Sequence, residues 1–235
     1  MITPLQEVER TIRAEVTHEC VDRRGHLAKY FSTDLKVFGL RTPVQRRIAQ
    51  IGFSWSSKAN DEQLERWNEV WVSGSAIETL SQPLFWLETI DDLDELLRYW
   101  PILKKWVKQV DNWVHSDQLS SQYSRMLEHR PDVLYPVMLK WNHSTRPWKR
   151  RQSLVSLLFY SRLRYNVLPQ EKILILVKHR IDDPHFFVQR GVGWCLRECW
   201  NVYPKETYDF LEAYANRLSA IAFSTASEKI SKQKL

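Results

Sequence analysis

The chain has 235 residues, 43% of them hydrophobic and 26% charged, which is enough for one sizeable core, and we expect a single domain. Glycine is scarce, with 6 residues, tryptophan is abundant, with 11, and alternating β-branched runs are few, so a sheet-rich fold is disfavoured. No apolar run approaches the roughly 18 residues of a membrane-spanning helix, and the N-terminus lacks the apolar core of a secretory signal. We therefore expect a protein of a reduced, intracellular compartment with no membrane partner.

Apolar residues recur at helical spacing along most of the chain, and turn signals separate the segments. The predicted helices cover 5–16, 44–51, 61–72, 76–87, a helix opening at 91, then 104–110, 112–128, 131–140, 147–162, 168–179, 184–200 and 203–222. Thr42 is the expected N-cap before 44–51, with Pro43 in the first turn, and Pro83 is expected to interrupt its helix.

About a dozen helices joined by short polar linkers favour an all-α solenoid of helical pairs over a closed bundle. We expect this domain to span residues 1–223. The segment 224–235 is polar and basic without periodicity, so we expect it to be disordered.

The net charge of +6 is unevenly distributed. Residues 101–200 carry 17 basic and 8 acidic side chains, whereas residues 1–100 carry 12 basic and 16 acidic ones. A basic region within a folded domain favours a polyanionic partner, nucleic acid first, and the alternative is a set of solvated helix faces without a partner. The three cysteines show no metal-ligand spacing, so we expect buried thiols and no metal site.

Four residues stand about one structural repeat apart. Asp117 lies one helical turn after Trp113, Arg151 follows Trp113 by 38 residues, and Trp194 follows Arg151 by 43. Helical-pair repeats recur about every 40–47 residues, so equivalent positions are expected to line one side of the stack. A carboxylate, a guanidinium and two indoles on one surface indicate a cationic or polyanionic ligand.

The positions of residues around a helix show which side chains share a face. In 184–200, Trp194 lies opposite the apolar stripe, and Arg190 and Arg197 flank it. Two interpretations remain open: the indole packs against a neighbouring helix, or it offers its face to a cation or sugar while the arginines bind phosphate.

In 112–128, Ser120 and Ser124 share a stripe with Asp117, and these small residues are expected to leave room for a ligand or water in front of the carboxylate. A first-turn acid favoured by the helix dipole is the alternative. Arg151 projects towards the interior and needs a carboxylate or phosphate there, for which Asp117 is a candidate. A structural Arg–Asp pair does not exclude a functional one.

Four segments resemble the AlkD-type bacterial alkylpurine DNA glycosylases of the DNA alkylation repair family. Residues 187–198, Phe-Val-Gln-Arg-Gly-Val-Gly-Trp-Cys-Leu-Arg-Glu, are similar to the signature Phe-x-Gln-Lys-Ala-x-Gly-Trp-x-Leu-Arg-Glu. Trp113-Val-His-Ser-Asp117 resembles a Trp-x-x-x-Asp motif, and Trp148-Lys-Arg-Arg151 resembles Trp-x-x-Arg. Residues 30–43, which begin with Tyr and end in Gly-Leu-Arg-Thr-Pro, resemble the segment Tyr…Gly-Ile-x-Thr-Pro.

The resemblance implies a HEAT-like solenoid of antiparallel helices whose concave, basic face binds double-stranded DNA. It implies hydrolysis of the N-glycosidic bond of positively charged N3- and N7-alkylated purines, such as 3-methyladenine and 7-methylguanine. Such enzymes act without base flipping, metal or cofactor. The resemblance also implies a monomeric, cytoplasmic bacterial enzyme.

Residue roles follow from the same resemblance. Asp117 is then the catalytic carboxylate, Trp113 and Trp194 contact the deoxyribose, and Arg151 holds the DNA backbone near the lesion. The expected DNA-binding residues are Tyr30, Arg41, Thr42, Lys149, Arg150, Gln189, Arg190 and Arg197.

Two other functions remain open at this stage. A DNA-binding protein of the same fold recognises branched or distorted DNA without excising a base, and the joint presence of the four residues argues against it. A HEAT-like scaffold binds proteins instead, and salt-sensitive DNA binding through residues such as Lys104 and Lys108 would argue against that function.

Overall fold

The structure is a computed structural model that describes residues 2–229. Within this part of the chain the regular elements are helices, with one isolated β-bridge between Lys36 and Ala76 and no strand. The all-α solenoid class predicted from the sequence is therefore confirmed. The chain divides into two compact units between His115 and Ser116, inside the helix α8 (Trp113–His129).

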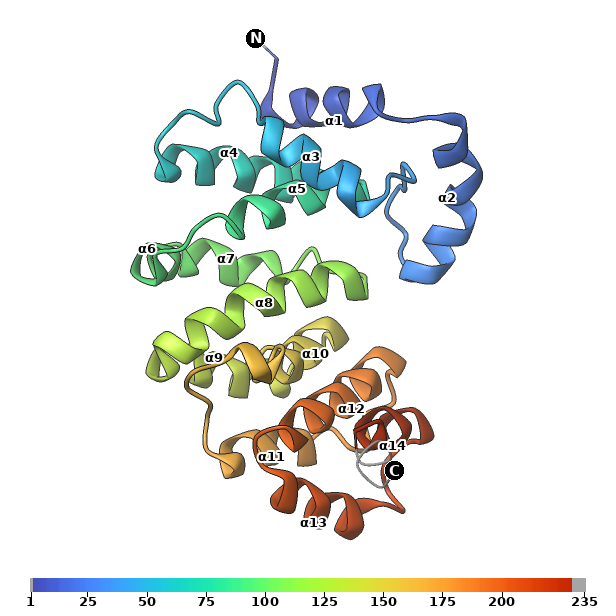
Figure 1. The fold of residues 1–235 in the computed structure, drawn as a ribbon, viewed down its shortest axis with the longest axis vertical. Helices are drawn as coiled ribbons and strands as arrows, with labels where there is room; N and C mark the ends of the chain where they lie inside the picture. Colours follow the sequence, from blue (N-terminus) through green and yellow to red (C-terminus); the bar gives the residue numbers. More distant parts are fainter. Residues whose placement is uncertain (1, 230–235) are drawn as a thin grey trace. The chain divides into compact units, whose positions relative to one another are not determined.

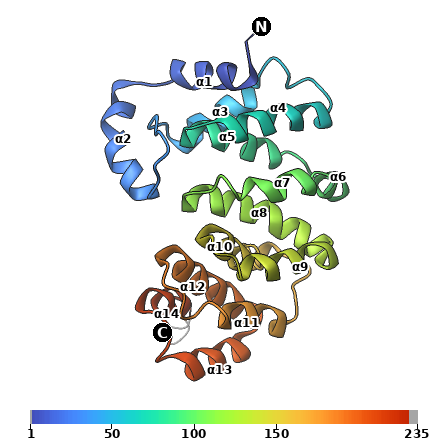
Figure 2. The same ribbon diagram turned by 180° about the vertical axis from the view of Figure 1, so that it is seen from behind.

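The first unit is built around the buried helix α5. Its helices are α1 (Pro4–Ala14), α2 (His18–Phe31), α3 (Thr42–Ile51), α4 (Asn60–Ser73), α5 (Ile77–Leu87), α6 (Leu93–Arg98) and α7 (Trp100–Trp106) (Figure 1). The helices α1, α3 and α4 pack on α5, whereas α2 lies to one side of them in both views (Figures 1 and 2).

The prediction that Pro83 interrupts its helix is wrong. It lies inside α5, and every residue of this helix is buried. Burial on all sides favours a continuous helix enough to offset the roughly 3 kcal/mol that an interior proline costs.

Glu78, in the first turn of α5, organises the segment that leads into α3. Its carboxylate accepts hydrogen bonds of 2.9, 2.7 and 3.2 Å from the backbone N–H groups of residues 38–40. Gly39 has a φ of +90°, and a Cβ there would lie 2.1 Å from the carbonyl oxygen of Cys20, so only glycine fits. These contacts fix the turn immediately before the exposed Arg41.

In the second unit α12 is the central helix. After residues 116–129 of α8, the elements are α9 (Pro131–Asn142), α10 (Pro147–Val155), the 3-10 helix η1 (Ser161–Leu163), α11 (Gln170–Lys178), α12 (Phe186–Trp200), α13 (Pro204–Tyr214) and α14 (Ala220–Ser227). The helix α12 packs against α10, α11, α13 and α14. Gly193 permits the approach of α14, because a Cβ there would lie 2.7 Å from the carbonyl oxygen of Ala222.

Several predicted helix ends differ from the structure. The N-cap of α3 is Arg41 and not Thr42, because Thr42 already has helical geometry beside the first-turn proline. The helix predicted at 147–162 ends at Val155, and the one predicted at 203–222 is split into α13 and α14. The helix α2 was not predicted, because within it only Cys20 is buried and the apolar stripe is correspondingly weak.

The segment predicted to be disordered, 224–235, includes the end of a helix. Residues 224–227 belong to α14, where Ala226 is fully buried and Thr225 is nearly so, because this turn packs on α12. The residues from 230 onward lie outside the described part of the chain. Among the described helices, none combines the length and apolar character needed to cross a membrane.

Candidate functional site

A buried ion pair joins three helices of the second unit. Arg151, on α10, donates from Nη2 to Oδ1 of Asp117 on α8 at 2.6 Å, and from Nη1 to the carbonyl oxygen of Phe187 on α12 at 2.9 Å. The Arg151 side chain is 5% exposed, whereas the Asp117 side chain remains 22% exposed. Of the two kinds of partner left open for Arg151, a carboxylate or a phosphate, the structure shows the carboxylate of Asp117, which is held in one orientation while part of it stays open to solvent.

The hydroxyl residues beside Asp117 do not form the expected open space. Ser120 is fully buried, and its Oγ accepts a 2.7 Å hydrogen bond from Nε2 of Gln152 on α10. The same amide donates to Oγ of Ser156 at 3.0 Å. Ser124 is buried as well. These small side chains therefore allow α8 to pack closely on α10. A ligand can reach Asp117 only at the part of its side chain that is exposed to solvent.

Trp194 lies half-buried on α12 among aromatic and cationic neighbours. Phe159 stacks on its ring with centroids 5.8 Å apart, and Tyr160 meets it edge-on at 5.4 Å. The guanidinium of Arg197 lies 4.2 Å from the ring centroid, in a cation–π contact. Arg197 also pairs with Glu228 at 2.9 Å. The cation on this indole is therefore Arg197 of the same helix, an arginine that was expected to bind phosphate.

Trp113 is fixed within the first unit. Its indole Nε1 donates to the carbonyl oxygen of Tyr30 at 3.0 Å, and the Tyr30 ring packs edge-on against it with centroids 5.3 Å apart. Phe31 adds a second edge contact at 6.2 Å. The exposed Tyr30 therefore packs on Trp113 and accepts its hydrogen bond, and the sequence pattern did not indicate this contact.

His115, between Trp113 and Asp117 in the sequence, belongs to the core of the first unit. The side chain is fully buried, with Nδ1 3.0 Å from the Asn112 amide nitrogen and Nε2 3.1 Å from the carbonyl oxygen of Ile77. Burial lowers the pKa of His115 to about 4, against smaller opposing effects of the Ile77 carbonyl and Asp111. His115 is therefore a neutral structural residue near pH 7.

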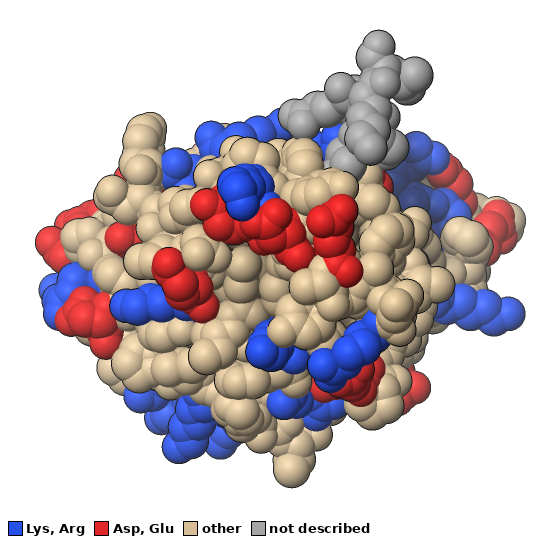
Figure 3. All heavy atoms as spheres, turned by 90° about the horizontal axis from the view of Figure 1, so that it is seen from below, with Lys and Arg blue, Asp and Glu red and all other residues tan. Residues whose placement is uncertain are grey.

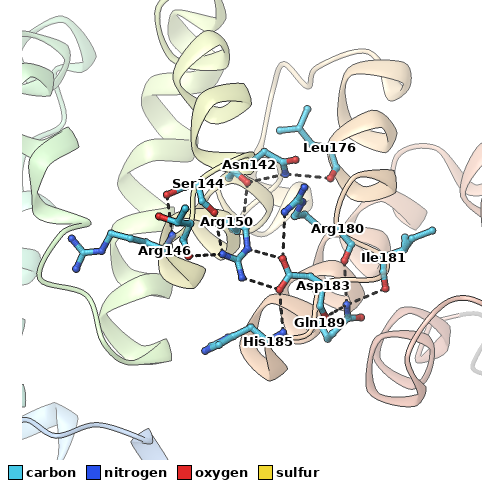
Figure 4. A network of polar contacts seen from close by, with 12 residues as sticks. Asn142, Ser144, Arg146, Arg150, Leu176, Arg180, Ile181, Asp183, His185 and Gln189 are labelled. Atoms are coloured by element: carbon cyan, nitrogen blue, oxygen red, sulfur yellow. Dashed lines mark hydrogen bonds and ion pairs between the residues drawn. The ribbon is translucent and has the colours of Figure 1, made fainter.

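Two of the expected DNA-binding residues have internal roles. Arg150 holds Asp183 through two hydrogen bonds of 2.6 and 3.0 Å and also donates to the carbonyl oxygens of Ser144 and Thr145 (Figure 4). Gln189 is buried, and its amide donates to three carbonyl oxygens in the turn before α12 (Figure 4). Because these donors are already used, both side chains hold the turn between α11 and α12 in place of the expected contact with DNA.

Asp183 is the centre of this network, and the sequence pattern did not single it out. Burial raises the pKa of its carboxyl, but the hydrogen bonds from Arg150 and from the His185 N–H outweigh that effect and leave the pKa below its usual value. The sequence shows only an Asp-Asp-Pro turn at 182–184, and such a turn does not identify a buried acid.

The remaining expected DNA contacts lie at the surface. Arg41 and Thr42 are exposed at the start of α3, and Arg41 forms an ion pair with Glu19. Lys149 is partly exposed. Arg190 is exposed and has no ion pair with the described residues. Within residues 2–229, no group of three His, Cys, Asp or Glu side chains is arranged to hold a metal ion.

Comparison with known proteins identifies the family. The model of a family described as DNA alkylation repair enzyme matches residues 17–230. The chain belongs to the DNA alkylation repair enzyme family. Membership gives it a role in DNA alkylation repair and makes DNA its partner. No curated protein sequence matches the chain.

Solved structures share the fold of this family member at low sequence identity. A structure described as a predicted DNA alkylation repair enzyme from Enterococcus faecalis has a TM-score of 0.71 and 16% identity, over 90% of this chain and 96% of that one. AlkD2 from Streptococcus mutans has a TM-score of 0.58 and 15% identity, over 87% of this chain and 95% of that one. These likenesses concern the fold.

Proposed function

We propose that the protein is a monofunctional DNA glycosylase that hydrolyses the N-glycosidic bond of positively charged N3- and N7-alkylated purines in duplex DNA, without base flipping or cofactor. The observation that carries the proposal is the pair of Asp117 and Arg151. A buried guanidinium holds the carboxylate in place, and the carboxylate remains partly exposed. Family membership supplies the DNA partner and the repair role.

The chemistry requires little acid catalysis. An N3- or N7-alkylated purine is already cationic, so it leaves as a neutral base with the electron pair of the glycosidic bond. The deoxyribose then develops oxocarbenium character. A fixed carboxylate stabilises this charge, and indole faces add about 0.5–2 kcal/mol each through cation–π attraction. The oxygen of a water molecule bonds to C1′, and its proton passes to Asp117.

Residue roles follow from this chemistry. Asp117 is the catalytic carboxylate, and Trp113 and Trp194 contact the deoxyribose. Arg151 acts as a positioning residue for Asp117, because its Nη1 and Nη2 groups donate inside the protein. Because no lysine lies in the motifs at Asp117 and Trp194, water is the nucleophile and the DNA strand stays intact.

The surface side chains supply the affinity for DNA. Phosphate contacts come from exposed or partly exposed residues, namely Arg41, Thr42, Lys149, Arg190 and Arg197. Each such contact releases counterions, so affinity falls as salt rises. In the free protein the Arg197 guanidinium contacts the Trp194 ring. When DNA binds, this guanidinium leaves the ring and binds a phosphate.

One observation favours a second candidate function. The Trp194 ring is covered by Phe159 and Arg197 in the free protein, and a covered indole does not offer its face to a sugar. The alternative is recognition of branched or distorted DNA without base excision, with the pair of Asp117 and Arg151 serving the fold alone.

An assay of base release distinguishes glycosylase activity from DNA recognition without excision. The protein is incubated with duplex DNA carrying 7-methylguanine and 3-methyladenine, free bases are separated by chromatography, and the strands are run on a denaturing gel. Glycosylase activity predicts free methylated bases and intact strands until alkali is added. Absence of base release, with tighter binding to a three-way junction than to the methylated duplex, contradicts the proposal and supports the alternative.

A further inference from the structure

The loop of residues 160–166, between α10 and α11, is anchored at both ends by carboxylates. At its start, the N–H and Oγ of Ser161 both donate to Glu198 at 2.9 Å. At its end, Glu128 accepts hydrogen bonds from the N–H groups of residues 165 and 166 at 2.5 and 2.8 Å and pairs with Arg164 at 3.2 Å. The backbone of the loop is therefore fixed.

The large side chains of this anchored loop nevertheless point to solvent. Leu163 is 58% exposed and Tyr165 is 97% exposed. Arg162 is exposed and has no ion pair with the described residues. These side chains add almost nothing to the core. Single exposed apolar residues are ordinary, but a bulky pair beside an exposed guanidinium on a fixed backbone is suited to binding a ligand.

The first residue of the loop contacts Trp194. Tyr160 has a φ of +49°, in the left-handed region that residues other than glycine seldom adopt, and its ring lies edge-on to Trp194. The guanidinium of Arg162 lies 5.7 Å from the centroid of the Tyr160 ring. A row of aromatic and cationic groups thus leads from Trp194 onto the loop.

The face on the α13 side of the unit has a different character. Acidic and basic side chains are interspersed there (Figure 3), and α13 carries Glu206, Asp209 and Glu212 beside Lys205. Such a surface repels phosphate as much as it attracts it. It provides matched positions for control substitutions.

We infer that the 160–166 loop is a DNA contact that binds the strand beside Trp194, with Arg162 on a phosphate and Leu163 and Tyr165 packed on deoxyribose. Interleaved cationic and aromatic side chains are the usual means of following a nucleic-acid backbone. The inference deepens the proposed function and rests on its DNA partner, but it does not depend on base excision.

The test compares two triple variants of the full chain. One carries Arg162→Gln, Leu163→Ser and Tyr165→Ser. The control carries Lys205→Gln, Ile175→Ser and Tyr208→Ser, which remove the same charge and similar exposed apolar groups elsewhere on the unit. Affinity for methylated and unmethylated duplex is measured by fluorescence anisotropy over a range of salt concentrations, with thermal melting as a check on folding.

The loop variant is expected to bind both duplexes about tenfold more weakly, and its slope of log affinity against log salt should fall by about one, while the control matches the unsubstituted protein. Equal affinity of the loop variant and the control overturns the inference. If no base is released but the loop variant still binds weakly, the inference stands and the proposed function fails.

Discussion

Replacing Arg151 by methionine removes the guanidinium while keeping most of the stem. Two acceptors then lose their donor, the Asp117 carboxylate and the Phe187 carbonyl oxygen. Breaking a buried ion pair from one side costs about 3–5 kcal/mol. Because the Asp117 side chain is 22% exposed, water replaces part of the interaction, and we expect a loss of about 2–3 kcal/mol in the free energy of unfolding. The unfolding equilibrium then shifts by roughly a hundredfold.

Urea denaturation followed by circular dichroism measures this loss through the transition midpoint at constant slope. The control is Arg130→Met, which breaks the exposed pair of Arg130 and Asp132 and should leave the midpoint nearly unchanged. A third variant, Arg151→Met with Asp117→Leu, removes both charges and should recover part of the stability. A loss below about 0.5 kcal/mol for Arg151→Met would refute the reasoning, because it would mean that the pair contributes no more than a surface contact.

Two further predictions concern packing and pH. Gly193→Ala should destabilise the protein by about 1–3 kcal/mol, because its Cβ would lie 2.7 Å from the Ala222 carbonyl oxygen. Gly191→Ala should be tolerated, because its Cβ would make ordinary contacts of 3.4 Å with Arg151 and 3.6 Å with Val155; equal melting temperatures for the two variants would contradict this. Burial lowers the pKa of His115 to about 4. Between about pH 6.5 and 4 this histidine is therefore protonated in the unfolded chain but neutral in the folded one, and the free energy of unfolding should fall by roughly 3 kcal/mol as the pH is lowered through this range. His115→Gln should remove that part of the pH dependence of the urea midpoint, and an undiminished dependence would show that other groups cause it.

Periodicity predicted the parts of the fold and site that depend on helix faces. The inward direction of Arg151 followed from the apolar stripe of α10, and the spacing of one repeat made Asp117 a candidate for its partner. The position of Arg197 beside Trp194 on α12 followed in the same way, but its contact with the ring was not predicted. These interactions join neighbouring turns or neighbouring repeats, for which sequence spacing is informative.

Other features depend on contacts that spacing does not encode. Phe159 and Tyr160 reach Trp194 because α10 ends at Val155, although its apolar pattern continues to Leu158 and predicted a longer helix. Gln189 has the residue type expected of a DNA contact, but its amide donates to three carbonyl oxygens of the turn before α12. The partner of a polar side chain was predictable only where one candidate lay at the right distance along the chain.

The most direct measurement is the single-turnover rate of 7-methylguanine release from a defined duplex by the unsubstituted protein, by Asp117→Asn and by Asp132→Asn. Asparagine keeps an oxygen to accept from Arg151 but removes the charge that stabilises the sugar cation. The account predicts that Asp117→Asn releases the base at least about a hundredfold more slowly with DNA affinity nearly unchanged, while Asp132→Asn, on the exposed pair with Arg130, behaves like the unsubstituted protein. Equal rates for Asp117→Asn and the unsubstituted protein would contradict it.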